Sequence, residues 1–203
     1  MIHKDRSEVF KEKARAYFDR KAEKYDESVL GNHTNNSQYA ALLEMVKSMK
    51  FRYMLDVGCG TGTVIDAILK DKEPGTYAAG IDISPEMIKK AKERLGAKAE
   101  LVVGDSEKLP WGDQKFELIV CVNSFHYFPH PETSLAEMRR VINIRGKLMI
   151  ADVWFAFPLR HIINLTMPLV GRDGDFHIYS KSEIEKLVEN AGFQVTNWRQ
   201  SGM

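Results

Sequence analysis

Short apolar runs alternate with amphipathic helical patterns over most of the chain after residue 53. Apolar runs bounded by polar or glycine-containing stretches are typical of buried strands, whereas apolar positions at three- and four-residue spacings indicate helices. Because strands alternate with helices, the pattern predicts a parallel sheet that is covered on both faces. The predicted strands are Tyr53–Val57, Tyr77–Ile81, Ala99–Val103, Phe116–Val122, Lys147–Val153 and Phe193–Trp198.

Three helices are predicted between or after these strands, and two of them have recognisable starts and ends. Ser84 is a favourable N-cap with Pro85 at the first helical position, and Gly96 ends that helix. A second helix, further along the chain, covers Pro131–Ile142. Ser180 with Glu183 forms a capping box that opens the last helix, which Gly192 closes. The strand and helix signals together predict a Rossmann-like, doubly wound, mainly parallel α/β fold with strand order 3-2-1-4-5 plus a sixth strand.

The segments outside this alternation define the expected organisation. Helical patterns at Ser7–Tyr25 and Tyr39–Met49, separated by the polar stretch Gly31–Ser37, precede the first strand. We therefore expect one domain over residues 1–203, made of an N-terminal helical cap (1–50), a ligand-binding core (51–153), an insertion (154–179), and the last helix and strand (180–203). The insertion is long and apolar, which favours a lid or pocket wall, although core packing or a dimer surface would give the same composition.

The stretch LDVGCGTGT at Leu55–Thr63 predicts a ligand-binding turn between the first strand and its helix. In an open parallel sheet, ligands bind beyond the carboxyl ends of the strands, and glycines let the backbone approach them closely. A dinucleotide fingerprint, G-x-G-x-x-G, would need glycine at Thr63. The observed spacing is G-x-G-x-G, which disfavours a nicotinamide dinucleotide but does not exclude it.

Three carboxylates follow successive predicted strands. Asp56 precedes the glycine turn, Asp82 follows the second strand, and Asp105 follows the third. A pyrophosphate at this edge would meet negative charge with no nearby Arg or Lys, whereas a ligand with a positive centre would be favoured. A carboxylate at the position of Asp82 can also accept both hydroxyls of an unphosphorylated ribose. S-adenosylmethionine combines a free ribose, a sulfonium and an amino-acid end.

Four motifs in order carry a family resemblance: LDVGCGTG, GIDISPEM (Gly80–Met87), GDSEKLPW (Gly104–Trp111) and FELIVCVNSFHYF (Phe116–Phe128). The chain resembles class I S-adenosylmethionine-dependent methyltransferases over nearly its whole length. Its opening FDRKAEKYD (Phe18–Asp26) is similar to the branch that includes the ubiquinone and menaquinone biosynthesis methyltransferases. Class I methyltransferases usually end their sheet with a hairpin of sixth and seventh strands. This sequence stops at Met203, after the sixth predicted strand, so either the chain is truncated or the edge of the sheet is completed in another way.

The resemblance implies which residues bind the donor. Asp56 and the turn would hold the methionine end, Asp82 the ribose, Asn123 would line the methionine side through its backbone, and Tyr25 would close over the donor. The turn residues are Gly58, Cys59, Gly60 and Gly62. Cys59 has its small size as an alternative explanation, and Asp56 could instead orient the turn through hydrogen bonds to backbone amides.

At the other end of the donor, the resemblance implies an adenine site. Ile83 and Met87 would pack on the base, and Asp105 would accept from its amino group with Ser106 beside it.

The composition limits the partners. Lys plus Arg (29) nearly cancels Asp plus Glu (28), so no overall field favours nucleic acid or an anionic membrane, and a small-molecule substrate is expected. No apolar stretch approaches the length of a membrane span, nothing at the N-terminus is typical of a signal peptide, and two cysteines imply no disulfide framework. We expect a cytoplasmic protein that could form a homodimer.

Methyl transfer is an in-line displacement on an activated donor, so alignment and water exclusion are the main requirements. A general base is needed only when the nucleophile carries a proton of high pKa. Of the candidates His126, Tyr127, His161, His177 and Tyr179, we select His126 because it follows the fourth strand directly. No metal is expected, since Pro129 breaks any helix that would pair His126 with His130. The main alternative function is a non-catalytic protein that binds the donor or a partner; an NAD-binding protein is a further alternative.

Overall fold

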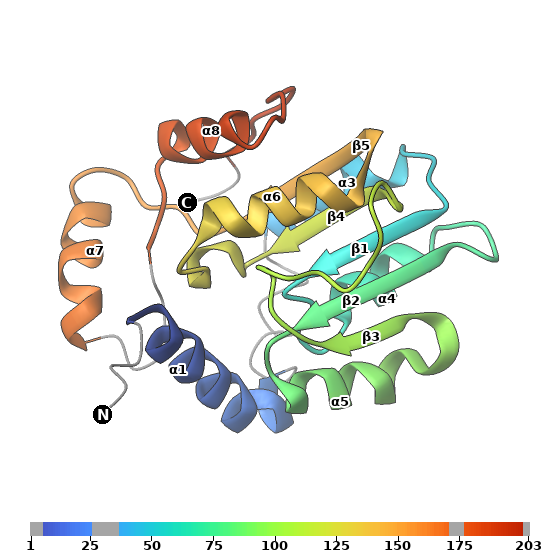
Figure 1. Ribbon diagram of the computed structural model, residues 1–203, viewed down its shortest axis with the longest axis horizontal. Helices are drawn as coiled ribbons and strands as arrows, with labels where there is room; N and C mark the ends of the chain where they lie inside the picture. Colours follow the sequence, from blue (N-terminus) through green and yellow to red (C-terminus); the bar gives the residue numbers. More distant parts are fainter. Residues whose placement is uncertain (1–5, 26–36, 171–176, 201–203) are drawn as a thin grey trace.

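The computed structural model describes residues 6–25, 37–170 and 177–200. A five-stranded parallel sheet in the order β3-β2-β1-β4-β5 lies at its centre (Figure 1). This arrangement confirms the predicted α/β class and strand order, and it brings the carboxyl ends of all five strands to one edge. The strands are β1 (Tyr53–Val57), β2 (Tyr77–Asp82), β3 (Glu100–Val103), β4 (Phe116–Val122) and β5 (Ile142–Ala151).

Helices cover both faces of the sheet and its carboxyl edge. Figure 1 shows α1 lying beyond the arrowheads of the strands, close to the start of α5. The expected polar break at 31–37 lies almost entirely outside the described residues. The helices are α1 (Arg6–Lys21), α3 (Ser37–Lys47), α4 (Thr63–Leu69), α5 (Pro85–Leu95), α6 (Pro131–Val141), α7 (Leu159–Val170) and α8 (Lys181–Asn190), with 3-10 turns η1 (Ala22–Lys24), η2 (Gly96–Lys98) and η3 (Phe125–Tyr127).

Two apolar cores lie on opposite faces of the sheet because successive strand residues point to opposite sides. On one face, Leu55 and Val57 of β1 pack with α6 and α8. On the other face, Met54 of the same strand packs with α3, α4 and α5. Burial on both faces accounts for the continuous apolar runs from which the strands were predicted.

The predicted helix signals are confirmed. Ser84 Oγ accepts from the backbone N–H of Met87 at 3.1 Å, with Pro85 at the first position of α5. The capping box of α8 is complete: Ser180 Oγ accepts from the Glu183 N–H, and the Glu183 carboxylate accepts from the Ser180 N–H at 2.6 Å. Gly192 has a φ of +83° just beyond the end of α8, a conformation that favours glycine.

The predicted sixth strand is wrong. Residues 193–200 contain no strand, and β5 is an edge of the described sheet. A strand needs a neighbour for its backbone hydrogen bonds, and the apolar residues Val195 and Trp198 are exposed instead of packed.

The fifth strand begins earlier than predicted. Phe116 pairs with Ile142 and Leu118 with Lys147, so residues 143–146 form an irregularity in the ladder. The polar residues and Gly146 in this stretch resemble a turn in sequence, and regular pairing begins at Lys147, where the strand was predicted. None of the helices in the described ranges combines the length and apolar character that crossing a membrane requires.

Candidate active site

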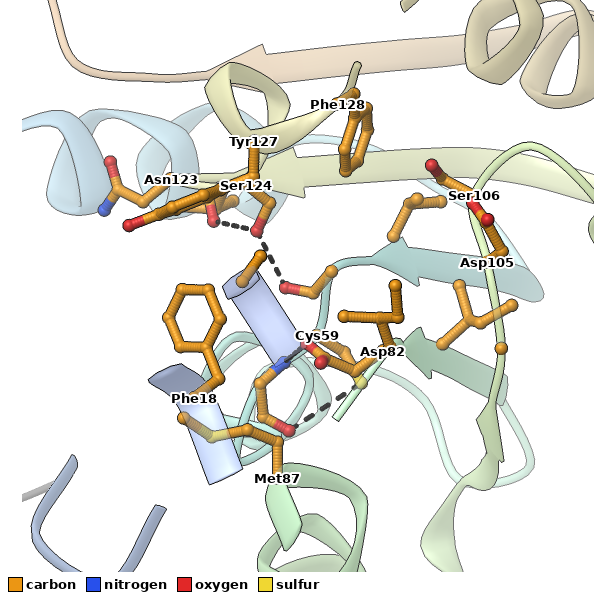
Figure 2. A pocket seen from close by; sticks show the side chains of 18 of the residues that line it. Phe18, Cys59, Asp82, Met87, Asp105, Ser106, Asn123, Ser124, Tyr127 and Phe128 are labelled. Atoms are coloured by element: carbon orange, nitrogen blue, oxygen red, sulfur yellow. Dashed lines mark hydrogen bonds between the residues drawn. The ribbon is translucent and has the colours of Figure 1, made fainter. Parts of the chain in front are cut away.

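A cavity lies at the carboxyl edge of the sheet, where the predicted ligand site was placed. Its walls come from α1, the glycine turn after β1, the end of β2, the loop after β3 and the loop after β4 (Figure 2). The lining residues are Lys11, Ala14, Phe18, Tyr25, Val57, Gly58, Cys59, Gly60, Thr61, Thr63, Val64, Ile81, Asp82, Ile83, Met87, Gly104, Asp105, Ser106, Val122, Asn123, Ser124, Tyr127, Phe128 and Pro129. Ten of the twelve residues predicted to bind the donor are among them; Asp56 and Gly62 are not.

The glycines of the turn have different structural tasks. Gly58 has a φ of +76°, and a Cβ there would lie 2.4 Å from Ser124 Oγ, so this glycine allows the β1 and β4 loops to meet. Ser124 Oγ also donates to the Gly58 carbonyl at 3.0 Å. Gly62 has a φ of +77°, and a Cβ there would lie 2.7 Å from Leu95 of α5. Gly62 therefore faces helix packing and not the cavity.

Asp82 connects the glycine turn to the start of α5. Its Oδ2 accepts from the Gly60 N–H at 2.9 Å, and its Oδ1 accepts from the Ser84 N–H at 2.9 Å. Burial raises the pKa of Asp82 to about 6, against the opposing effect of these two hydrogen bonds. Each carboxylate oxygen can accept a second hydrogen bond, so Asp82 can still bind two hydroxyls.

Asp56 lies beneath the turn and is fully buried. Neither of its oxygens has a hydrogen-bond partner within the described residues, so the alternative role of orienting the turn through amide hydrogen bonds is not observed. Burial raises the pKa of Asp56 to about 8, and the charge of Asp82 adds to the effect. A nearby cationic ligand would favour the ionised form of Asp56 and lower its pKa, although Asp56 itself does not line the cavity.

The predicted adenine residues Ile83, Met87, Asp105 and Ser106 line one part of the cavity. The expectation that no Arg or Lys lies nearby is wrong, because Lys11 of α1 also lines this part and lies 2.8 Å from Asp105. Lys11 is 94 positions from Asp105 in sequence, and the amphipathic pattern of α1 did not reveal that it reaches this site.

Aromatic rings form another part of the wall. The ring of Phe18 meets those of Tyr127 and Tyr25 edge to face, with centroid distances of 5.0 and 6.1 Å. Figure 2 shows Phe18 and Tyr127 together, apart from Asp105 and Ser106. Phe18, Thr61, Thr63 and Phe128 were not predicted as lining residues. The threonines lie inside the motif LDVGCGTGT, so a transfer of the whole turn would have found them.

The ring of His126, the selected catalytic candidate, does not line the cavity. Its Nδ1 lies 2.6 Å from Asp152 Oδ1, and its backbone N–H donates to Asp152 Oδ2 at 2.9 Å. The ring packs against that of Tyr127, which does line the cavity, with a centroid distance of 4.2 Å and an angle of 39° between the ring planes. The candidates His161, His177 and Tyr179 are also absent from the lining residues. A direct catalytic role of His126 stays a prediction that this geometry does not support.

The site suits the chemistry of S-adenosylmethionine. Asp82 offers acceptors for ribose hydroxyls, and the carboxylates of Asp82 and Asp105 in the lining favour a ligand with a positive centre. Nothing lies within 4 Å of a Cβ placed on Gly60, so the backbone there is open to a ligand. Individual donor contacts of the predicted residues stay predictions.

Residues 50–192 match the family model described as a methyltransferase domain, and the chain belongs to this family. It is an S-adenosylmethionine-dependent methyltransferase by family and fold. The chain is 29% identical to a demethylmenaquinone methyltransferase of Thermotoga maritima, with 92% of this chain and 90% of the relative covered.

Two solved structures share the fold. One is the methyltransferase in a Haloferax volcanii complex with the Trm112 methyltransferase activator, with a TM-score of 0.75, 22% identity, and coverage of 91% of this chain and 78% of that chain. The other is an S-adenosylmethionine-dependent methyltransferase of Aquifex aeolicus, with a TM-score of 0.66, 23% identity, and coverage of 88% and 90%.

Proposed function

We propose that the chain transfers the methyl group of S-adenosylmethionine to a small, uncharged and largely apolar acceptor. The observation that carries this proposal is the aromatic wall, which consists of Phe18, Tyr127 and Phe128 and adjoins Tyr25, the residue expected to close over the donor. Among the described lining residues, the charged side chains are Lys11, Asp82 and Asp105, and all three belong to the predicted donor side. An apolar acceptor would therefore lie against the aromatic wall, where burial of its surface favours binding.

The donor supplies an activated methyl group, so the residues of the chain mainly bind and orient. Asp82 and the glycine turn would fix the ribose and the methionine end, while the aromatic wall would align the acceptor and exclude water. Positioning of this kind contributes about 7–11 kcal/mol in favourable cases. No histidine lines the described cavity, so the proposal favours a nucleophile that needs no histidine base.

The named activity of the Thermotoga maritima relative, demethylmenaquinone methylation, supports an acceptor of this kind. The acceptor atom, the expected cytoplasmic location and the expected homodimer stay predictions.

A methyl-transfer screen tests the proposal. The protein would be incubated with methyl-labelled S-adenosylmethionine and metabolite extract separated into aqueous and organic phases. We expect label in a small molecule of the organic phase, with Asp82→Ala as the inactive control. Label only in protein, nucleic acid or polar metabolites would contradict the proposal.

A second candidate is a donor-binding protein that acts through a partner, since a fold alone does not determine function. The methyltransferase of the Haloferax volcanii structure, which shares this fold, is in complex with an activator protein, so a partner is the feature that this candidate adds. Binding of S-adenosylhomocysteine without any methyl transfer in the screen would support this candidate, and transfer by the isolated chain would oppose it.

A further inference from the structure

Lys11 brings a positive charge from the N-terminal cap into the wall of the cavity. Its Nζ lies 2.8 Å from Asp105 Oδ2 and 2.9 Å from Glu107 Oε1, and its side chain is 11% exposed. Burial lowers the pKa of Lys11, but the two carboxylates outweigh this effect and raise the pKa above its ordinary value. Lys11 therefore stays an ammonium at neutral pH, with Asp105 as an adjacent acceptor.

An ammonium has three N–H donors, and the ion pairs of Lys11 with Asp105 and Glu107 can engage at most two of them. Glu8, on the same helix, lies 3.7 Å from Lys11 Nζ, which is beyond hydrogen-bond distance. Asp105 Oδ1 accepts from the Glu107 N–H at 3.0 Å, and each Asp105 oxygen can accept again. The cavity wall thus presents one hydrogen-bond donor beside one acceptor.

Adenine carries the complementary pattern, because its N6 amino group donates and lies between the acceptors N1 and N7. We propose that Lys11 is a specificity-determining residue for the donor: its ammonium donates to N1 or N7 of adenine while Asp105 accepts from N6. The cap helix α1 would then contact the base directly. This inference rests on the S-adenosylmethionine site and not on the identity of the acceptor.

The need to attach α1 to the rest of the domain does not by itself explain why Lys11 is buried in the cavity wall. The same helix and the η1 turn after it are tied to α5 at two further points, by Ser84 Oγ donating to Asp19 at 2.6 Å and by Lys90 and Glu23 at 3.1 Å. Neither of these ties involves a lining residue of the cavity. Burial of an ammonium is costly, and a position in the cavity wall gives that charge a ligand to recognise.

Calorimetry with three ligands tests the inference: S-adenosylhomocysteine, its 1-deaza analogue and its 7-deaza analogue, each analogue lacking one ring acceptor. We expect wild-type protein to bind one analogue about tenfold more weakly than S-adenosylhomocysteine, as the loss of one charge-assisted hydrogen bond implies. Lys11→Met should bind S-adenosylhomocysteine about tenfold more weakly and should no longer distinguish it from that analogue. Lys11→Arg keeps a donor and should retain the distinction.

Lys90→Met is the matched control, because it removes a tie between the cap and α5 outside the cavity. It should leave the preference among the three ligands unchanged. Equal weakening of all three ligands by Lys11→Met would show that Lys11 only attaches the cap, and equal wild-type affinity for the three would also overturn the inference. If Lys11→Met does not fold, the double variant Lys11→Met with Glu107→Gln, which also neutralises one of the carboxylates paired with Lys11, provides the same donor-free comparison. Failure of wild-type protein to bind S-adenosylhomocysteine would instead contradict the donor assignment.

Discussion

On the donor side of the cavity, backbone groups and carboxylates from the loops after β1, β2 and β3 provide the polar contacts. On the proposed acceptor side, aromatic rings from α1 and from the loop after β4 face one another. The donor side is fixed by hydrogen bonds between neighbouring loops and by glycines at positive φ, of which Gly58 and Gly62 leave no room for a Cβ. The acceptor side depends on packing between segments that are about 100 positions apart, Phe18 in α1 and Tyr127 after β4.

The largest expected effect comes from Gly58→Ala, which would disrupt the contact between Gly58 in the loop after β1 and Ser124 in the loop after β4. A Cβ there would lie 2.4 Å from Ser124 Oγ in a backbone with a φ of +76°. Strain and overpacking together should cost about 3 kcal/mol of the free energy of unfolding and should abolish binding of S-adenosylhomocysteine. Urea unfolding and calorimetry measure both effects. Gly75→Ala, at a φ of +89° with open space around its Cβ, is the control; an equal loss in the two variants would remove the steric explanation.

Asp82→Asn should affect the donor side alone. Loss of the charge and of one acceptor should weaken S-adenosylhomocysteine binding about 100-fold, the range for a charged hydrogen-bonding partner. Because burial raises the pKa of Asp82 to about 6, wild-type affinity should fall as the pH decreases through 6, whereas the affinity of the variant should not. Calorimetry from pH 5 to 8 measures this. A normal affinity for Asp82→Asn at pH 7.5 would show that the ribose assignment is wrong.

Asp56 also belongs to the donor side, but its substitution should mainly change the free energy of unfolding. With a pKa of about 8 when folded and 3.8 as its ordinary value, the folded chain binds more protons than the unfolded chain between these limits. The contribution of Asp56 to the free energy of unfolding is therefore fully present below pH 3.8 and is lost as the pH rises through 8. The loss is up to about 1.4 kcal/mol per pH unit. Asp56→Asn should remove this slope in urea unfolding between pH 5 and 8. Parallel pH profiles for the two proteins would mean that Asp56 is ionised throughout.

Tyr127→Ala should separate the two sides most directly. It removes a ring that lines the cavity and contacts Phe18, so transfer to an apolar acceptor should fall about tenfold, as loss of an aromatic contact and its buried area implies. Affinity for S-adenosylhomocysteine should stay within about twofold of wild type. Phe157→Ala, at an exposed ring outside the cavity, is the control. An equal loss of donor binding would show that the wall serves the donor.

The comparison explains what the sequence could predict. The donor side lies in contiguous motifs, so Asp82, Asp105 and the glycine turn were predicted with the strand order that brings them together. Lys11 and Phe18 reach the cavity from a helix whose pattern indicates only its packing face. The failed sixth strand has the same cause, because an apolar alternation such as Phe193–Trp198 becomes a strand only beside a partner. Whether a side chain such as His126 points into a cavity or behind its wall depends on tertiary packing that sequence order does not encode.

His126 should show the smallest effect of the residues compared. Its ring lies behind Tyr127 and bonds to Asp152 at 2.6 Å, so its removal should loosen the wall and not the chemistry. His126→Asn should lower methyl transfer by only about threefold and leave the shape of its pH profile unchanged, whereas loss of a general base costs about 100-fold or more. Asp152→Asn should lower methyl transfer by a similar factor, because the Asp152 carboxylate holds both the ring and the backbone N–H of His126. A loss of methyl transfer of about 100-fold in His126→Asn, together with loss of the acidic limb of its pH profile in that variant alone, would instead identify His126 as the general base.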